Sequence, residues 1–155
     1  MKIDPAYSLE TAVLVGCGVT TGIGAVLNTA QVKPGSWVAI VGSGGVGLNA
    51  IQGAVLASAE RIIAIDLVQK KLELAKSFGA TDLINASEAN PVDQVHDLTN
   101  GKGVDYAFEV VGNPKTIEQA YDMIRPAGMV IIVGVSHHEA KISIPAQWLV
   151  RQEKQ

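Results

Sequence analysis

The stretch "VAIVGSGGVGLNA" (residues 38–50) decides the fold of this 155-residue chain. An apolar run ends at Gly42, and Gly42, Gly44 and Gly47 follow in the spacing G-x-G-x-x-G. Between a strand and a helix, this spacing is typical of a loop that contacts a pyrophosphate. The first glycine permits the tight turn, the second lets the backbone approach the phosphates, and the third lets the helix pack on the sheet. The free N–H groups at the helix start favour the phosphate charge.

A second apolar run, "RIIAID", ends at Asp66, 19 residues after Gly47. An acid about 20 residues after the loop is expected to bind the ribose hydroxyls of a dinucleotide. The carboxylate would repel a 2′-phosphate, and no arginine follows it, so the pattern favours NAD over NADP. Lys71, one helical turn further on, is a candidate for a hydrogen bond to the same ribose. The alternatives are that the glycines only make a turn, Asp66 only caps the next helix, and Lys71 is a solvated lysine.

The flanking sequence alternates short apolar runs with amphipathic stretches. Strands are expected at 37–42, 61–66, 81–85, 101–112 (with its turn) and 128–135, and helices at 47–59, 68–80, 91–100 and 114–125. Most of the strands are continuous apolar runs, which is typical of strands covered on both faces. The order predicts an α/β fold: a doubly wound parallel sheet of five strands in three layers. The whole chain, 1–155, is expected to be one dinucleotide-binding domain.

Composition excludes several classes of protein. The net charge of −3 gives no clustered basic face for nucleic acid. A single cysteine excludes a disulfide framework and fits a cytoplasmic location. No apolar run has the length of a membrane span, and the N-terminus has no signal-peptide core, so no membrane partner is expected.

Longer motifs resemble a known family. They are "GCGVTTGIGA" (16–25), "NTAQVKPGSWVAIVGSGGVG" (28–47), "IIAID" (62–66), "KLELAKSFGAT" (71–81), "GVDYAFEVVG" (103–112) and "GMVIIVGV" (128–135). Together they resemble the coenzyme domain, a Rossmann fold, of the zinc-dependent medium-chain alcohol dehydrogenases. The similarity is strongest to the class III, glutathione-dependent formaldehyde dehydrogenases, which are oxidoreductases that pass hydride between an alcohol and NAD.

The resemblance implies a set of site residues. Cys17 matches one of three protein ligands of the catalytic zinc, and Thr21 matches a threonine beside the nicotinamide. The cofactor-binding positions that the resemblance implies are Gly42, Gly44, Gly45, Val46 and Gly47 for the pyrophosphate, Asp66 and Lys71 for the ribose, Val111 for the adenine, and Val135 for the nicotinamide carboxamide.

The sequence also departs from the family. The other two zinc ligands belong to a catalytic domain that has no counterpart in these residues, and the sixth strand of the sheet is missing. We therefore expect a truncated form that binds NAD(H), holds no stable zinc and has no alcohol dehydrogenase activity by itself. A free-standing NAD(H)-binding or interaction module is the alternative. His96, in the expected helix at 91–100, and His137 and His138, after the strand at 128–135, are expected to be exposed residues rather than replacement ligands.

Without a sixth strand, the strand at 128–135 has an apolar edge, and such edges recruit partners. The chain is therefore expected to form a homo-oligomer through this edge, or to cover the edge with its own C-terminal segment. Trp148 is a candidate for the covering side chain, and the alternative is that it is an ordinary buried anchor.

Other dinucleotide enzymes fit less well. A short-chain dehydrogenase needs a Tyr-x-x-x-Lys pair, and none of the three tyrosines is followed by lysine at that spacing. A methyltransferase does not need the GCG segment. A zinc-free quinone reductase typically lacks the cysteine of that segment, and it is the nearest rival for the parent enzyme.

Overall fold

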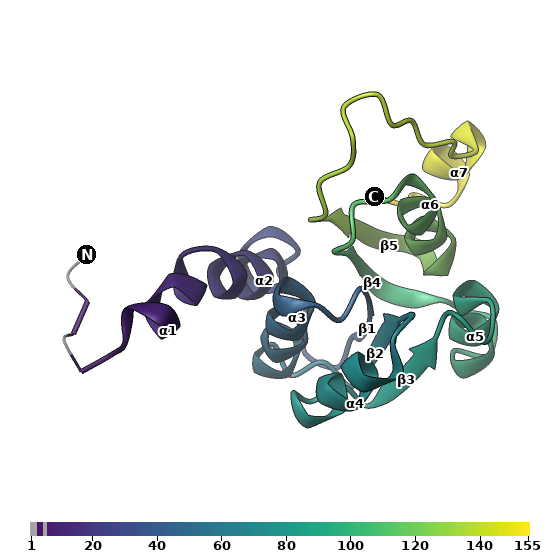
Figure 1. Cartoon of the computed structure of the whole chain (residues 1–155). Coiled ribbons are helices and arrows are strands. Elements are labelled where there is room, and N and C mark those ends of the chain that lie inside the picture. Colours follow the sequence, from purple (N-terminus) through teal and green to yellow (C-terminus); the bar gives the residue numbers. More distant parts are fainter. Residues whose placement is uncertain (1–2, 5) are drawn as a thin grey trace.

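A five-stranded parallel sheet forms the centre of the computed structural model, which describes residues 3–4 and 6–155 (Figure 1). The strand order is β3-β2-β1-β4-β5, so the chain reverses its direction of winding between β1 and β4. The strands are β1 (Trp37–Val41), β2 (Arg61–Asp66), β3 (Asp82–Asn85), β4 (Val104–Glu109) and β5 (Ile124–Ile132). The predicted doubly wound sheet is confirmed.

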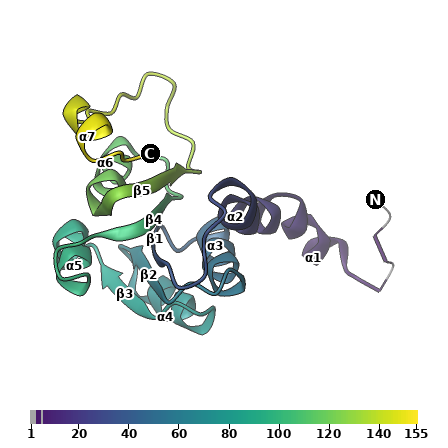
Figure 2. The same cartoon turned by 180° about the vertical axis from the view of Figure 1, so that it is seen from behind.

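Helices cover both faces of the sheet (Figures 1 and 2). One core lies between the sheet and the helices at residues 9–29, 45–56 and 69–77, and the other lies between the sheet and the helices at residues 91–98, 114–123 and 146–151. Residues 38–41 of β1 are buried on both faces, as the continuous apolar run predicts. The helices are α1 (Leu9–Leu14), α2 (Thr20–Gly24), α3 (Gly45–Leu56), α4 (Gln69–Ser77), α5 (Pro91–Leu98), α6 (Pro114–Met123) and α7 (Ala146–Arg151).

The last strand begins four residues earlier than the sequence predicts. Ile124 already pairs with Val104, and pairing then resumes at Met129 opposite Tyr106. Between the two lies a bulge in which Ala127 has a positive φ of 58°. The segment "RPAG" has the composition of a turn, but the flanking apolar residues pair with β4 and keep it within the strand.

Residues 9–29 form one continuous helix that contains two π-helical turns, Val15–Val19 and Ala25–Thr29. This 21-residue helix is long and apolar enough to cross a membrane by length and composition alone, and 11% of its apolar 18-residue window is buried. The expectation that no segment has this length is therefore wrong. Glycines and threonines interrupt the apolar runs but do not make the segment polar. In Figure 1 its N-terminal part projects away from the sheet.

The C-terminal segment covers part of the outer edge of β5. The Ala127 and Val130 N–H groups donate to the carbonyls of Gln152 and Gln155, at 2.7 Å each, and the Gln155 N–H donates to the Gly128 carbonyl. The expectation that the chain folds back over this edge is confirmed for residues 127–130. The covering groups belong to the backbone and not to Trp148.

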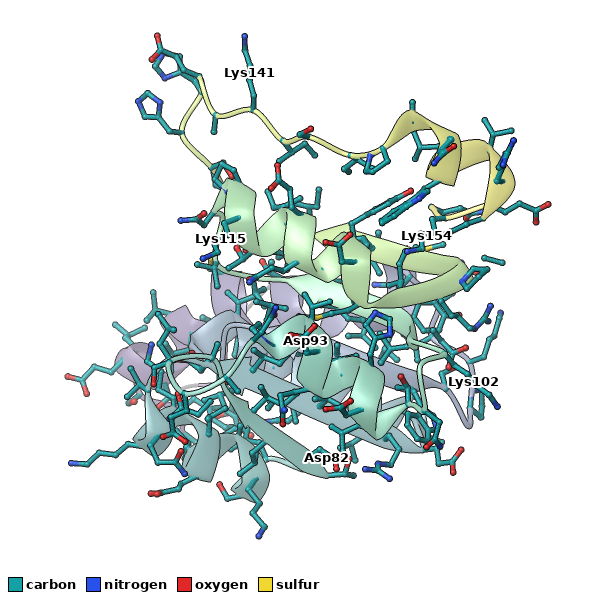
Figure 3. All side chains as sticks on the ribbon, turned by 90° about the vertical axis from the view of Figure 1, so that its right-hand side faces the viewer. Asp82, Asp93, Lys102, Lys115, Lys141 and Lys154 are labelled. Carbon is teal, nitrogen blue, oxygen red and sulfur yellow. The ribbon has the colours of Figure 1, made fainter. Side chains whose placement is uncertain are left out.

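Trp148 is instead an anchor. Its ring stacks on that of Tyr121 in α6, with centroids 6.4 Å apart and an interplanar angle of 7°. The Lys154 ammonium lies over both rings, and it donates a hydrogen bond to the Tyr121 carbonyl. Figure 3 shows Lys154 between α6 and the C-terminal segment. These contacts attach α7 and the segment after it to α6.

Candidate functional site

The largest group of predicted site residues meets at the carboxyl ends of β1, β2 and β4. A cavity of about 420 Å³ opens there, beside the point where the winding of the sheet reverses. Open α/β sheets bind ligands at this position. Of the predicted residues, the cavity is lined by Gly42, Asp66, Lys71 and Val111. Four of the predicted positions thus lie around one cavity.

The glycine loop is tight for steric reasons. Gly42 has a φ of +101°, and a Cβ on it would lie 2.8 Å from Val111 Cγ2. A Cβ on Gly47 would collide with the Gly42 carbonyl oxygen. By contrast, a Cβ on Gly44 or Gly45 would meet no atom within 4 Å. Two glycines thus let the loop close on itself, and the other two leave open space in front of α3.

Gly44 caps α3, and Gly45, Val46 and Gly47 form the first turn. The first N–H groups of a helix have no partner within the helix, so they are available to an anionic ligand. The Leu48 N–H, at 2.8 Å from the Gly44 carbonyl, is where bonding within the helix begins. This geometry suits the phosphate-loop interpretation of the sequence.

Asp66 does not cap α4, because Val68 occupies the N-cap position. Its Oδ2 accepts a hydrogen bond from the Ser43 N–H at 2.8 Å, and its Oδ1 accepts one from the Val68 N–H at 3.0 Å. Lys71 Nζ lies 3.8 Å from Oδ2. A carboxylate has about four lone-pair sites, so each oxygen of Asp66 can accept a further bond from a ribose hydroxyl.

The opposite wall of the cavity comes from α6 and the turn before it, and sequence reasoning missed it. Its residues are Asn113, Lys115, Thr116 and Gln119. In Figure 3 Lys115 lies at the start of α6. The expected order of the strands could have indicated these residues. The winding of the sheet reverses between β1 and β4, so the helix after β4 begins beside the glycine loop.

Three predicted residues lie away from this cavity. Cys17 is exposed in the first π-helical turn, and Thr21 is exposed in α2, which packs against α3. Val135 follows β5 with its side chain 92% exposed, and its backbone approaches Gly112.

The described residues do not provide a zinc site. Within residues 3–4 and 6–155, no three His, Cys, Asp or Glu side chains come together as metal ligands. Zinc takes four ligands, three of them from the protein in a catalytic site, so the thiol of Cys17 alone does not fit the ion. His137 and His138 are exposed, as expected. His96 lies on α5, within the predicted helix, but it is half-buried rather than exposed, with Nε2 3.0 Å from the Asp122 carbonyl oxygen.

Comparison with known proteins adds to this geometry. Residues 45–155 match the family described as zinc-binding dehydrogenase. The chain belongs to the zinc-binding dehydrogenase family. It is 47% identical over 155 residues to S-(hydroxymethyl)glutathione dehydrogenase of Synechocystis sp., covering 99% of this chain and 42% of that protein.

Solved structures of zinc-binding dehydrogenases share the fold. Benzyl alcohol dehydrogenase of Acinetobacter calcoaceticus superposes with a TM-score of 0.93 at 34% identity, over 99% of this chain and 42% of that one. A zinc-binding dehydrogenase of Sinorhizobium meliloti, solved with NADP bound, has a TM-score of 0.83 at 28% identity, over 89% and 41% of the two chains. The chain thus spans about two fifths of the length of these relatives.

Proposed function

We propose that this chain is the NAD(H)-binding domain of a zinc-dependent alcohol dehydrogenase. The observation that carries the proposal is the meeting of Gly42, Asp66 and Lys71 in one cavity at the winding reversal. Bound NAD supplies the hydride acceptor for the oxidation of an alcohol. The residues of this chain bind and orient it: the α3 N-terminus holds the pyrophosphate, and Asp66 and Lys71 hold the ribose.

NAD is favoured over NADP at this site. The Asp66 side chain is only 8% exposed, and both of its oxygens are already fixed by backbone N–H groups. It is therefore held where a 2′-phosphate would bring a second negative charge against it. The relative from Sinorhizobium meliloti was solved with NADP, so the preference is a property to be measured on this chain.

The direct test is isothermal titration of the purified chain with NADH, with NADPH as the control. Saturable binding of NADH and weaker binding of NADPH support the proposal. Binding of neither nucleotide contradicts it.

Catalysis requires groups beyond those described. A single thiol cannot hold the metal, so we propose that the purified chain retains no stoichiometric zinc and does not turn over S-(hydroxymethyl)glutathione, the substrate in the name of its relatives. Elemental analysis and an NAD-reduction assay test both points. One zinc per chain, or sustained turnover by pure protein, would contradict them. Cys17 and Thr21 are then proposed to act when a catalytic domain completes the site.

A free-standing NAD(H)-binding module is the second candidate. It is favoured by the same cavity, which forms from residues of this chain alone. The two candidates differ in one measurement. Restoration of alcohol-dependent NAD reduction on addition of a catalytic-domain fragment from a relative supports the domain of an enzyme. Binding of NADH without any such restoration supports the module.

We also propose that two copies of the chain associate through β5 and that the chain acts in the cytoplasm. The C-terminal segment covers β5 only as far as Val130, and Ile132 beyond it is 51% exposed on the edge of the sheet. Exposed apolar strand edges template pairing with another chain. Light scattering tests the association, and partition of the expressed chain between the soluble and membrane fractions tests the location.

A further inference from the structure

Glu109 is a buried acid that the proposed site does not yet explain. It is the last residue of β4, it pairs with Val41 of β1, and its side chain is fully buried. No Lys, Arg or His nitrogen among the described residues lies within 4.0 Å of its carboxylate. A buried acid without a cation must be stabilised by other donors.

Those donors come from the turn after β4. The Val111 N–H donates to Oε1 at 3.0 Å, and the Gly112 N–H reaches both carboxylate oxygens, at 2.9 and 3.1 Å. The Thr116 hydroxyl donates to Oε1 at 2.6 Å. Every contact of the carboxylate is thus with a donor, and both oxygens are used as acceptors.

The backbone of Glu109 reaches a third segment. Its carbonyl accepts hydrogen bonds from the Val133 and Gly134 N–H groups, at 2.8 and 3.0 Å. A single residue therefore joins the turn after β4, the first turn of α6 and the end of β5. These are three of the segments that surround the winding reversal of the sheet.

Two of the three segments that Glu109 joins, the turn after β4 and the first turn of α6, line the cavity. Val111 and Thr116 both line it. The Val111 side chain also lies against Gly42 of the glycine loop, where a Cβ would approach it to 2.8 Å. A shift of the turn by a few tenths of an ångström would therefore change both the width of the cavity and the fit of the glycine loop.

We propose that Glu109 is a positioning residue for the dinucleotide, which sets the wall formed by Val111 and Thr116 against the glycine loop. This inference rests on the proposed function. Glu109 touches no ligand itself and acts through the two residues that it holds. Its charge makes the hydrogen bonds from the turn stronger than bonds to a neutral acceptor.

Glu109→Gln tests the charge and keeps the shape. The amide nitrogen that replaces one oxygen cannot accept the Gly112 N–H, so the turn loses part of its support. Glu73→Gln is the matched control, because Glu73 is exposed on α4 and does not line the cavity. The affinities of NADH and AMP are measured by titration, with circular dichroism and chemical unfolding as measures of the fold.

We expect Glu109→Gln to raise the Kd of AMP and of NADH by the same factor, about tenfold, while the variant remains folded. AMP contains only the adenosine half, so an equal factor locates the effect in the wall of this cavity. Amide exchange at Val111 and Gly112 should become faster. Glu73→Gln should match the wild type in each measurement.

A folded Glu109→Gln variant with unchanged Kd values overturns the proposal, even if it unfolds more easily, because a merely structural role lowers stability without moving affinity. Failure of the wild type to bind NADH or AMP overturns the proposed function instead. In that case amide exchange still decides whether Glu109 orders the turn, and unchanged exchange in the variant would overturn that role as well.

Discussion

Asp66 Oδ2 accepts a hydrogen bond from the Ser43 N–H at 2.8 Å, so the acid at the end of β2 is hydrogen-bonded to the glycine loop after β1. The two groups that are proposed to hold ribose and pyrophosphate are therefore one unit before any ligand binds. Such preorganisation lowers the ordering cost of binding. It also means that a change at Asp66 affects the loop.

Replacement of Asp66 by asparagine should weaken the binding of NADH and reduce the preference for NADH over NADPH. The amide nitrogen opposes a backbone N–H group and the charge is lost, so the Kd of NADH should rise about tenfold or more. The affinity for NADPH should fall less, because the Asp66 carboxylate no longer repels its 2′-phosphate. Titration with both nucleotides measures the ratio. Asp93→Asn, an exposed change on α5 seen in Figure 3, is the control, and an unchanged ratio in Asp66→Asn would contradict the assignment.

Alanine at two neighbouring glycines should have opposite effects on stability. A Cβ at position 47 collides with the Gly42 carbonyl, so Gly47→Ala should lower the free energy of unfolding by about 1–3 kcal/mol. A Cβ at position 45 would meet open space at the start of a helix, so Gly45→Ala should leave the free energy of unfolding unchanged or raise it by up to about 1 kcal/mol. Urea unfolding without nucleotide compares the two. Equal destabilisation would show that the loop is not closed as described.

The ion pair between β2 and β3 should make stability sensitive to acid. Burial alone would raise the pKa of Asp82, but hydrogen bonds from Arg61 and Thr81 outweigh it and hold this pKa below its ordinary value. A lowered pKa in the folded state contributes stability above the unfolded value, about pH 4, and this stability is lost as the pH falls further.

Asp82→Asn should therefore lower the free energy of unfolding by about 1 kcal/mol or less at neutral pH, because the pair is partly exposed. The difference from the wild type should shrink as the pH falls below about 4. Urea unfolding at several pH values measures this, with Asp93→Asn as the exposed control. A difference that is constant with pH would exclude the ion pair as its cause.

Loss of the Trp148 ring should expose the edge of β5. Trp148→Ala removes the stack on Tyr121 and one of the two rings beneath Lys154, so residues 152–155 should detach more often. Amide exchange at Ala127 and Val130 should then become faster, and light scattering should show a larger share of associated chains. Leu149→Ala, at an exposed position on α7, is the control. Unchanged exchange at both amides would mean that the segment is held without this anchor.

The sheet was predictable from the sequence because β1 and β2 are buried on both faces and have the matching continuous apolar runs. The glycine spacing and Asp66 located one side of the cavity for a similar reason, since each of these residues serves a local steric or charge requirement. The opposite wall depends on how α6 is placed against β1. This is a long-range relation that no local pattern encodes.

Glu109 is a further example of a residue whose role depends on long-range relations that no local sequence pattern shows. An acid at the end of the apolar run "YAFE" is an anomaly that the sequence displays, and it could have been noted as a buried charge in need of donors. Its partners Val111, Gly112 and Thr116 are close in sequence, but their relation to Gly42 appears only in the folded chain. The bulge in β5 likewise follows from pairing with β4, because "RPAG" in isolation favours a turn.

The π-helical turn Val15–Val19 has a consequence for insertions and deletions in relatives of this chain. A π turn accommodates one more residue than the α-helical turn it replaces, and successive α-helical residues are rotated by about 100°. Deletion of one residue there would therefore convert the π turn into an α-helical turn and keep α1, with its exposed side chains Leu9 and Val13, facing the same way, whereas a deletion in a regular α-helical turn would rotate α1 by about 100° around the helix axis. The sheet would not be disturbed. This short segment can thus absorb a change of one residue in length without changing the direction of the projecting helix or the geometry of the nucleotide cavity.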